Sequence, residues 1–417
     1  MADSIRVPLN LPELQVLQQS LQPQQNRLTV WVQSRRAWCR CPSCGYASHH
    51  DVQDDRWRTV QDLDALGYHV FLRLRQRRFY CRRCRRRFME GFESVDVQQR
   101  QTGRLQAWLV TQSRSCPLLQ AARSSPVSYR VLRYLCFKVG QQRAQVWRRR
   151  ALPKRIGVDE FATRKGHSYA TVVVALTRHA VCGVTRDRTQ AALERLLRAP
   201  GARPRQVREA VEAVIDMWEP FYQALRTCCP QARIVIDRFH VERHLWQAVD
   251  ACRRRLSKNR KNRKNRKSGS RRPGPQTPCP LKAARALFLV PARQLSPQQR
   301  AEREMLLAQY PELRRCVQLA ECLHRWYSTV KDRQHADWQL GYWLRQLRQS
   351  GIPELVSLAE MLRRWRREIV NYFCAYATNG ITEGFNTKIK LLKRTGYGRL
   401  TFEHLTARIF LECGRSP

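Results

Sequence analysis

The chain has 417 residues, 43% of them hydrophobic, which is enough for two or three domains with sizeable cores and excludes a disordered protein. No apolar run approaches the ~20 residues of a membrane-spanning helix, and residues 1–21 lack the pattern of a secretory signal, so an intracellular protein is predicted. The net charge of +45, from 78 Lys and Arg against 33 Asp and Glu, indicates a nucleic-acid partner.

Residues 1–30 contain leucines among many glutamines. Leu14, Leu17 and Leu21 follow one another at spacings of three and four, which are typical of one face of a helix. The sequence therefore predicts a short amphipathic helix for this segment.

Two C-x-x-C pairs mark the next unit, residues 31–93. They are Cys41-Pro-Ser-Cys44 and Cys81-Arg-Arg-Cys84, and strands are predicted at 31–32, 68–74 and 78–80. Each pair aims two thiolates at one point, and four thiolates form the closed tetrahedral site of structural zinc. The pattern predicts one Zn²⁺ in a zinc-ribbon β module, although Cys39 could replace Cys41. Two unrelated pairs of buried thiols are the simpler alternative.

Residues 94–150 are predicted to form helices at 100–113, 117–123 and 128–140. Ser128 would cap the third helix, which carries Arg130 and Arg133. The short connection before it is typical of a helix-turn-helix module, whose last helix enters the major groove of DNA. A plain three-helix packing module is the alternative.

Residues 151–245 are predicted to begin a second, larger domain. Strands are expected at 156–159, 169–176 and 180–184, followed by a helix at 207–226 and a strand that ends at Asp237. Three hairpin-connected strands, a helix and a further strand resemble an RNase H-like α/β sheet.

Three acidic residues stand at the ends of predicted elements. Asp159 and Asp237 each follow an apolar run, and Glu383 lies on a predicted helix that has Thr382 as its N-cap and ends at Arg394. A buried, unpaired carboxylate costs on the order of several kcal/mol, so a bound cation is expected. Because Mg²⁺ takes oxygen ligands and keeps waters, these three residues could hold two ions for phosphoryl transfer. The alternative for Asp159 is a solvated turn residue.

Residues 246–375 are predicted to be an all-α insertion, with helices at 245–256, 297–309, 311–329, 335–349 and 353–372. Within it, residues 253–280 are predicted to be a disordered basic loop, because like charges follow one another there without an apolar period. We expect its cations to bind the DNA backbone without sequence preference: Lys258, Arg260, Lys261, Arg263, Lys264, Arg266 and Lys267. A solvated insertion is the alternative.

The last stretch, residues 376–417, is predicted to complete the sheet domain with the Glu383 helix and a second helix at 401–412. Asn386 and Lys390 follow Glu383 by three and seven residues, which places them on the face of the helix that carries the acid.

Three segments together resemble one protein family. They are Gly157-Val-Asp-Glu-Phe-Ala-x-Arg-Lys-Gly166, Val235-Ile-Asp-Arg-Phe-His240 and Thr378-Asn-Gly-Ile-Thr-Glu-Gly-Phe-Asn-Thr-Lys-Ile-Lys-Leu-Leu-Lys-Arg394. They are similar to the ISL3 family of bacterial insertion-sequence transposases, which belong to the DDE class and have an RNase H-like catalytic core. The resemblance extends from about Arg35 nearly to the C-terminus.

The resemblance implies roles for individual residues. Asp159, Asp237 and Glu383 would be the catalytic ligands of two Mg²⁺ or Mn²⁺ ions, and the zinc ligands would include Cys41 and Cys44 rather than Cys39. His240 would orient a carboxylate or approach the scissile phosphate, with a packing histidine as the alternative. On the Glu383 helix, Lys390 would contact transposon-end DNA. Lys388, Lys393 and Arg394 of the same helix are further predicted DNA-binding residues. Asn379 departs from the arginine that related groups carry at this position.

The sequence as a whole predicts a multidomain α+β DNA transposase. Its N-terminal zinc-ribbon and helix-turn-helix modules would precede an RNase H-like α/β core with a large all-α insertion. The expected partners are double-stranded DNA, both terminal inverted repeats and target, and a second or further copy of the chain. Metal-dependent cleavage and strand transfer would take place in the bacterial cytoplasm, at the nucleoid. A structure-selective DNA nuclease and a catalytically inactive DNA-binding regulator are the alternatives.

Overall fold

The computed structural model describes residues 7–49, 51–97, 99–114, 116–164, 168–198, 211–267, 280–375, 379–396 and 400–414. It divides into two compact units, residues 1–140 with 395–399 and residues 141–394 with 400–417. None of the described helices is long and apolar enough to cross a membrane.

The first unit contains a five-stranded sheet in the order β1-β2-β6-β5, with β7 paired to β6. Its strands are β1 (Leu14–Gln22), β2 (Arg27–Ser34), β5 (Val52–Gln61), β6 (His69–Tyr80) and β7 (Arg87–Met89). A separate two-stranded ladder joins β3 (Cys39–Arg40) to β4 (Ala47–Ser48). The predicted strands at 31–32, 68–74 and 78–80 fall within β2 and β6, apart from Tyr68. Alternate residues of β2 and β6, among them Val30, Val32, Leu72 and Leu74, form the buried core.

The helix predicted for residues 1–30 is wrong, because Leu14–Gln22 is the edge strand β1. It pairs antiparallel with β2 through a bulge between Val16 and Gln18, and the left-handed Asn26 (φ 49°) belongs to the turn that joins the two strands. Only Leu14 of this strand is buried. Pairing with β2, which lies later in the chain, overrides the helical leucine spacing.

The three helices predicted for residues 94–150 are confirmed. They are α1 (Gly103–Gln112), α2 (Leu118–Arg123) and α3 (Tyr129–Arg148), which is longer than predicted. The Ser128 hydroxyl accepts a hydrogen bond from the backbone N–H of Val131, at 3.5 Å, as the predicted cap requires.

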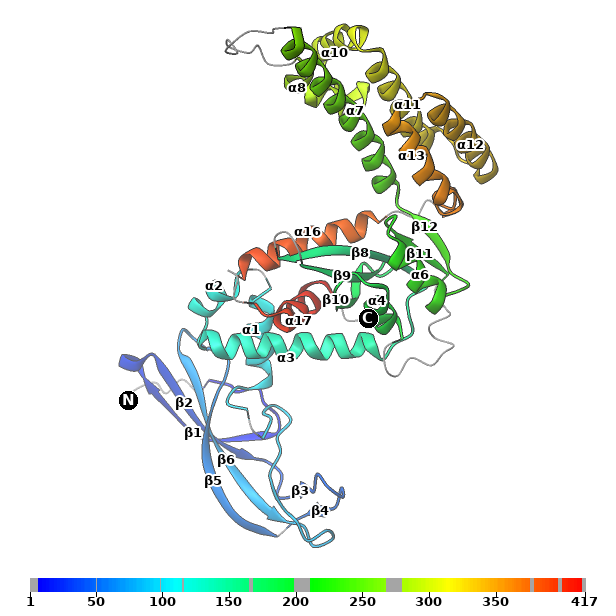
Figure 1. Cartoon of the computed structure of the whole chain (residues 1–417). Helices are drawn as coiled ribbons and strands as arrows, with labels where there is room; N and C mark the ends of the chain where they lie inside the picture. The colour runs from blue at the N-terminus through cyan, green and yellow to red at the C-terminus, as the bar shows by residue number, and fades with distance from the viewer. Residues whose placement is uncertain are drawn as a thin grey trace. The chain divides into compact units, whose positions relative to one another are not determined.

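The second unit contains a mixed five-stranded sheet in the order β10-β9-β8-β11-β12 (Figure 1). Its strands are β8 (Arg155–Arg164), β9 (Ser168–Ala175), β10 (Ala180–Arg186), β11 (Glu212–Ile215) and β12 (Arg233–Ile236). The first three strands are antiparallel, whereas β8, β11 and β12 run parallel. Residues Val172, Val173 and Val174 of β9 are almost fully buried, as expected for a β-branched run inside a sheet.

The helix predicted at 207–226 is a second correction. Residues 207–210 lie outside the described ranges, Glu212–Ile215 is the strand β11, and the helix that follows is α6 (Glu219–Cys228). A four-residue apolar run fits either a strand or a helix, so the local pattern did not decide. The helix α4 (Gln190–Leu197), which precedes β11, was not predicted.

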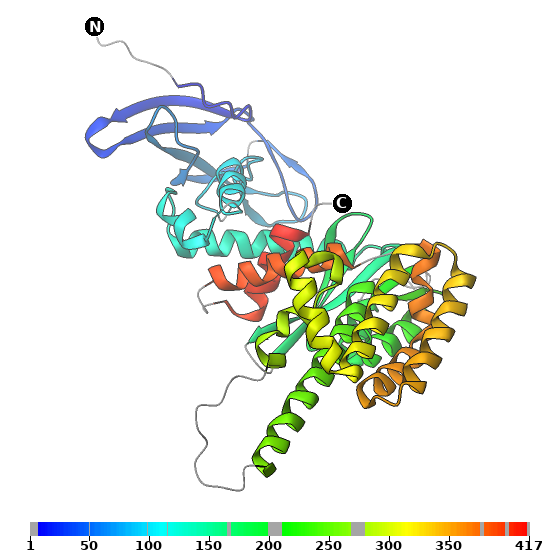
Figure 2. The ribbon, with the colours of Figure 1, turned by 90° about the horizontal axis from the view of Figure 1, so that it is seen from above.

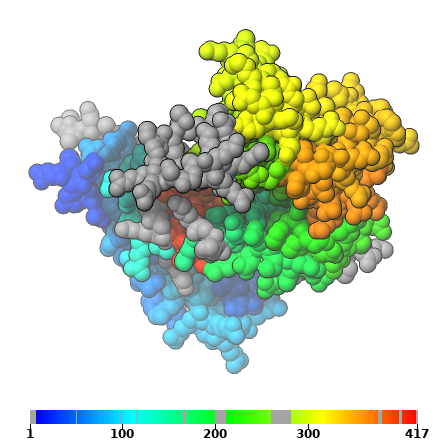
Figure 3. All heavy atoms as spheres, turned by 45° about the horizontal axis from the view of Figure 1, so that its top comes forward, coloured from blue at the N-terminus to red at the C-terminus, as the bar shows by residue number. Residues whose placement is uncertain are grey.

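Helices make up the region between β12 and residue 375. They are α7 (Arg238–Lys267), α8 (Pro280–Ala283), α9 (Arg285–Phe288), α10 (Pro297–Gln309), α11 (Pro311–Thr329), α12 (Arg333–Gln349), α13 (Pro353–Arg364), α14 (Arg366–Val370) and α15 (Tyr372–Ala375). Figure 2 shows α10 to α13 side by side in yellow and orange, and their atoms form a continuous body in Figure 3. A hydrogen bond from Asn371 to the carbonyl of Ile234, at 2.8 Å, attaches the end of this region to β12.

The predicted loop 253–280 begins as a helix, because α7 continues to Lys267. Residues 268–279, the middle of the predicted loop, lie outside the described ranges. The chain then returns to the sheet through α16 (Gly380–Thr395) and α17 (Phe402–Cys413).

Candidate active site

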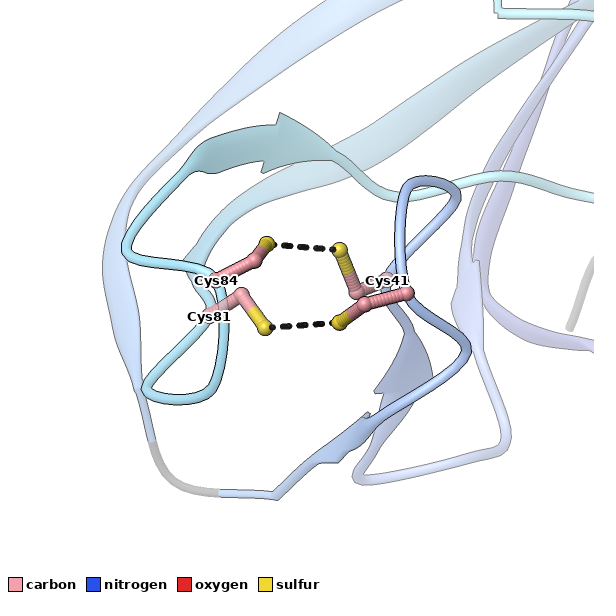
Figure 4. Close-up of side chains that lie close together, drawn as sticks. Cys41, Cys81 and Cys84 are labelled. Carbon is pink, nitrogen blue, oxygen red and sulfur yellow. Dashed lines mark hydrogen bonds between the residues drawn. The ribbon is translucent and has the colours of Figure 1, made fainter.

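Four cysteines of the first unit form one cluster (Figure 4). The sulfur of Cys41 lies 3.6 Å from that of Cys84, and the sulfur of Cys44 lies 3.5 Å from that of Cys81. All four sulfur atoms lie within 4.8 Å of one another, and no other His, Cys, Asp or Glu in the described ranges joins such a group. Tetrahedral zinc with Zn–S bonds of about 2.3 Å sets its sulfurs about 3.8 Å apart, so the cluster fits that ion.

The backbone around each cysteine pair explains this geometry. The N–H of Gly45 donates to the carbonyl of Cys41 at 2.9 Å, and the N–H of Arg85 donates to that of Cys81 at 2.8 Å. Gly45 and Arg85 both have positive φ, 73° and 56°, which closes each turn. Burial alone would raise the pKa of the Cys41 thiol, but hydrogen bonds from backbone N–H groups lower it to about 6.

A second group of polar residues lies at one end of the sheet in the second unit. Asp159 lies on β8, and β11 pairs with β8 in parallel, with Val214 opposite Gly157. Continuing this register by two residues places Asp216, directly after β11, opposite Asp159. Sequence reasoning missed Asp216, although it follows an apolar run just as Asp159 and Asp237 do, because its strand was taken for part of a helix.

The carboxylate of Asp159 is held by two hydrogen bonds. One oxygen accepts the backbone N–H of Glu160 at 2.7 Å, and the other accepts the side-chain amide of Asn386 at 2.8 Å. Burial raises the pKa of Asp159 to about 6, and the charge of Asp216 acts in the same direction.

Asp237 directly follows β12, as predicted. Its strand β12 does not pair with β8, because β11 lies between them. Asp237 directly precedes α7, and its carboxylate accepts backbone hydrogen bonds from Phe239 and Asn379. Burial raises its pKa, and the negative charge of Glu383 does so too. Asp237 thus lies near Glu383 and acts as an N-cap of α7.

His240 connects the acidic residues. Its Nδ1 lies 3.2 Å from a carboxylate oxygen of Asp216. Its charge also lowers the pKa of both Asp159 and Asp237, so it is near all three aspartates. The His240 side chain is largely buried, and its ring packs edge-on against Phe239.

Helix α16 carries Glu383, which lies near Asp237, because its negative charge raises the pKa of that residue. The helix starts at Gly380, so Thr382 lies in its first turn and is not the predicted N-cap. Thr382 and Asn386 are buried against β8, whereas Glu383 is exposed. The close approach depends on Gly157, where a Cβ would lie 2.3 Å from side-chain oxygens of Asn379 and Thr382.

Several buried polar atoms of this helix face the site without a partner. In the described structure, the side-chain amide atoms of Asn379, the hydroxyl of Thr382 and the Oδ1 of Asn386 accept or donate no hydrogen bond. Buried polar groups are nearly always satisfied by protein, water or an ion. Among the described residues, no three of the carboxylates at this end of the sheet have oxygens within 4.8 Å of one another.

The predicted DNA-binding residues of α16 differ in their surroundings. The ammonium of Lys388 donates to the carbonyl of Glu412 at 3.1 Å, and that of Lys393 donates to the carbonyl of Ala162 at 3.0 Å. Lys390 and Arg394 are both exposed and have no side-chain partner among the described residues. These two cations of the helix are therefore the most available to a phosphate.

The other predicted DNA contacts lie elsewhere. Arg130 is exposed and Arg133 half-buried on α3 of the first unit, and Lys258 is exposed on α7. The side chains of residues 260–267, which include the six remaining predicted cations, lie outside the described structure.

Comparison with known proteins places the chain in a family. The profile of the ISL3 group of DDE transposases, described as "Transposase", matches residues 156–409, and one described as "zinc-finger of transposase IS204/IS1001/IS1096/IS1165" matches residues 37–84. The transposase for insertion sequence element IS1001 of Bordetella parapertussis is 29% identical over 394 residues, 92% of this chain and 90% of that protein. The transposase for IS1557 of Mycobacterium tuberculosis is 28% identical over 297 residues, 67% of this chain and 66% of that protein. The chain thus belongs to the ISL3 family of DDE-class insertion-sequence transposases, enzymes of phosphoryl transfer with a zinc ribbon.

Proposed function

We propose that this transposase binds the ends of its insertion sequence and cleaves and joins DNA with two Mg²⁺ or Mn²⁺ ions held by Asp159, Asp216 and Glu383. The observation that carries the proposal is the pairing of β8 with β11, which sets two aspartates side by side next to the helix of Glu383. The strand order, three antiparallel strands followed by two parallel ones, supports an RNase H-like core.

Asp237, predicted from the sequence as the second metal ligand, stays a prediction. Its carboxylate accepts hydrogen bonds from the backbone of Phe239 and Asn379, which supports a structural role instead. In that role Asp237 would connect the starts of α7 and α16. His240 supports the site by orienting Asp216, and Asn386 supports it by orienting Asp159. An orienting partner of this kind fixes the direction of a ligand's lone pairs.

The divalent ions would supply a nucleophilic oxygen at neutral pH and neutralise the charge that develops on the phosphate. The residues of this chain hold the catalytic carboxylate and the DNA in position. Asn386 and the N–H of Glu160 fix both oxygens of Asp159, so that carboxylate needs no reorganisation when a ligand arrives. Lys390 offers an ammonium to a DNA phosphate on the helix that carries Glu383. A serine or tyrosine nucleophile is not required, because the attacking groups are water and then a DNA 3′-hydroxyl.

A strand-transfer assay tests the proposal. Purified protein, duplex DNA of the insertion-sequence end, target DNA and Mg²⁺ should give nicked ends and then joined products. A nuclease on the same core would give cleavage without joining, and an inactive regulator would bind the end DNA without either reaction. Either of these outcomes would refute the proposed function.

We also propose the modules that hold the DNA. Helices α1 to α3 would form the helix-turn-helix, with Arg130 and Arg133 toward the DNA, and Lys388, Lys390, Lys393 and Arg394 would bind near the cleavage site. The exposure of Arg130 and Lys390 supports this assignment. A homodimer or larger assembly on paired ends, and the domain boundaries predicted near residues 93, 150, 245 and 375, belong to the same proposal.

One structural Zn²⁺ is proposed for Cys41, Cys44, Cys81 and Cys84. We expect about one equivalent of zinc in the purified protein, and Cys44→Ser should lose the metal and most end binding, because the ribbon's folding energy comes largely from zinc. Cys39 lies outside the four-sulfur cluster, so Cys39→Ser is the matched control and should keep its zinc. The zinc content of both variants is measured by metal analysis. Loss of zinc from Cys39→Ser and retention of zinc in Cys44→Ser would show that Cys39, and not Cys44, is a zinc ligand.

The basic residues from Lys258 to Lys267 are expected to add DNA affinity without sequence preference. Replacing the seven Lys and Arg residues there with glutamine preserves helix-forming residues while it removes the charge. Each lost phosphate contact should reduce the slope of log K against log salt by about 0.9. The preference for end DNA over random DNA should remain, because phosphate contacts carry no sequence information. An unchanged slope, measured by binding titrations at several salt concentrations, would contradict this expectation.

A further inference from the structure

A cavity of about 330 Å³ lies along one side of α7. Its wall on that helix is formed by Phe239, Arg243, Trp246 and Gln247, and Arg285 and Leu289 close it from the segment around α9. Phe239 is 50% exposed, so about half of its side-chain surface is accessible from the cavity side and from solvent. The volume is in the lower part of the range for small-molecule sites, about 300–1,000 Å³.

The charges around the cavity favour an anionic or neutral occupant. Its two acids are already paired, since Glu242 accepts from Arg238 at 2.5 Å and Asp250 accepts from Arg253 at 2.7 Å. Arg243 and Gln247, by contrast, are exposed and have no side-chain partner within the described part of the chain. Two aromatic rings, one free guanidinium and one free amide are therefore presented together.

The cavity begins at the catalytic end of the sheet. Phe239 follows Asp237 by two residues, its ring contacts His240 with centroids 5.6 Å apart, and its N–H hydrogen-bonds to Asp237. Helix α7 runs away from the end of β12 (Figure 1), and at 1.5 Å per residue Trp246 lies about 10 Å further along it. That distance corresponds to about three nucleotides of a DNA strand at 3.4 Å each.

We propose that this cavity binds one unstacked base of the DNA strand that is cleaved, within about three nucleotides of the scissile phosphate. The inference rests on the proposed function. Stacking on an aromatic ring accepts any base, because every base has a π-face, and it offsets the cost of unstacking the duplex, a few kcal/mol. Gln247 can bind a base edge, and Arg243 can bind the adjoining phosphate. A base held in this way would keep the strand distorted next to Asp159 and Asp216.

The experiment compares two short duplexes of the same mixed sequence, one fully paired and one with a single 2-aminopurine opposite an abasic site. Binding is measured without added Mg²⁺, so no cleavage occurs. We expect the full-length protein to bind the second duplex more tightly and to quench 2-aminopurine fluorescence. Phe239→Ala should weaken binding of the second duplex by roughly 5- to 150-fold, the range for loss of one base-stacking contact, and leave the paired duplex unchanged. Phe239→Tyr should retain the preference.

Trp338→Ala is the matched control. Trp338 is 65% exposed on α12 and does not line the cavity, so its removal should leave the preference intact. An equal affinity of the wild-type protein for both duplexes would overturn the inference, as would an effect of Trp338→Ala as large as that of Phe239→Ala. A change of oligomeric state in Phe239→Ala without loss of the preference would assign the cavity to a second copy and would also overturn it. Failure to bind the paired duplex, in contrast, would count against the proposed function itself.

Discussion

Asp216→Asn is expected to reduce DNA cleavage and joining by at least ~10³-fold, about 4 kcal/mol in activation free energy, while DNA binding is preserved. The same result is expected for Asp159→Asn and for Glu383→Gln. Two divalent cations about 3.5–4 Å apart repel each other and need carboxylates around them, and an amide supplies no charge. Asp216 directly follows β11, the strand beside β8, its charge acts on Asp159, and it lies 3.2 Å from Nδ1 of His240.

Asp237→Asn tests whether Asp237 or Asp216 is the second aspartate ligand of the metal ions. Asparagine caps a helix about as well as aspartate does, so a residue that only caps α7 should tolerate the change with little loss of activity or stability. A residue that binds metal should lose activity on the same change, because the amide carries no negative charge. We expect Asp237→Asn to retain most of the cleavage activity and Asp237→Ala, which removes the cap, to lower the melting temperature.

The measurements are a cleavage assay, a gel shift and a thermal melt with and without Mg²⁺, all on the same preparations. In Asp216→Asn, the stabilisation by Mg²⁺ should shrink while the melting temperature without metal stays close to wild type. Full cleavage by Asp216→Asn together with loss of cleavage by Asp237→Asn would restore the ligand set predicted from the sequence. A variant that loses DNA binding as well as cleavage would be misfolded, and the thermal melt identifies it.

Features with a local signal could be predicted from the sequence. The spacing of each C-x-x-C pair brings its two thiols close together, and the two pairs form one cluster as predicted. Helix α10 begins where its signals lie, with Ser296 and Gln299 forming a capping box around Pro297. The strands β8 and β9 follow from their β-branched runs.

Features that depend on distant pairing could not be predicted. Glu212–Ile215 is too short to reveal a strand, and only its position between β8 and β12 makes Asp216 a neighbour of Asp159. The same pairing separates β12 from β8, so the strands that lead to Asp159 and Asp237 are not neighbours, which the sequence could not establish. Leu14–Gln22 likewise becomes a strand because β2 is there to pair with it. In each case the secondary structure depends on which strands are neighbours in the sheet, and no local sequence pattern specifies that order.

Gly157→Ala is expected to lower both stability and activity, although it adds a single methyl group. The new Cβ would lie 2.3 Å from the Oδ1 of Asn379 and from the Oγ1 of Thr382, closer than real Cβ atoms approach other atoms. Both neighbours are buried, Asn379 directly before α16 and Thr382 in its first turn, so either the start of this helix or β8 must move. Overpacking of this kind costs about 1–3 kcal/mol. Because Glu383 and Asn386 lie on the displaced helix, cleavage should fall further than the loss of stability explains.

Two further variants test whether the contact between residue 157 and α16 causes the expected loss of stability in Gly157→Ala. Gly384→Ala makes the same substitution in α16 itself, where a Cβ meets nothing within 4 Å, and it should raise the melting temperature because alanine favours a helix by up to about 1 kcal/mol. Thr382→Ala removes one of the two oxygens that the new Cβ would meet, so combining it with Gly157→Ala should recover part of the lost stability, measured as a coupling free energy between the two sites. A Gly157→Ala protein with wild-type melting temperature and wild-type cleavage would show that α16 can move away from β8 without cost. The position of Glu383 on α16 would then not depend on the missing side chain at residue 157.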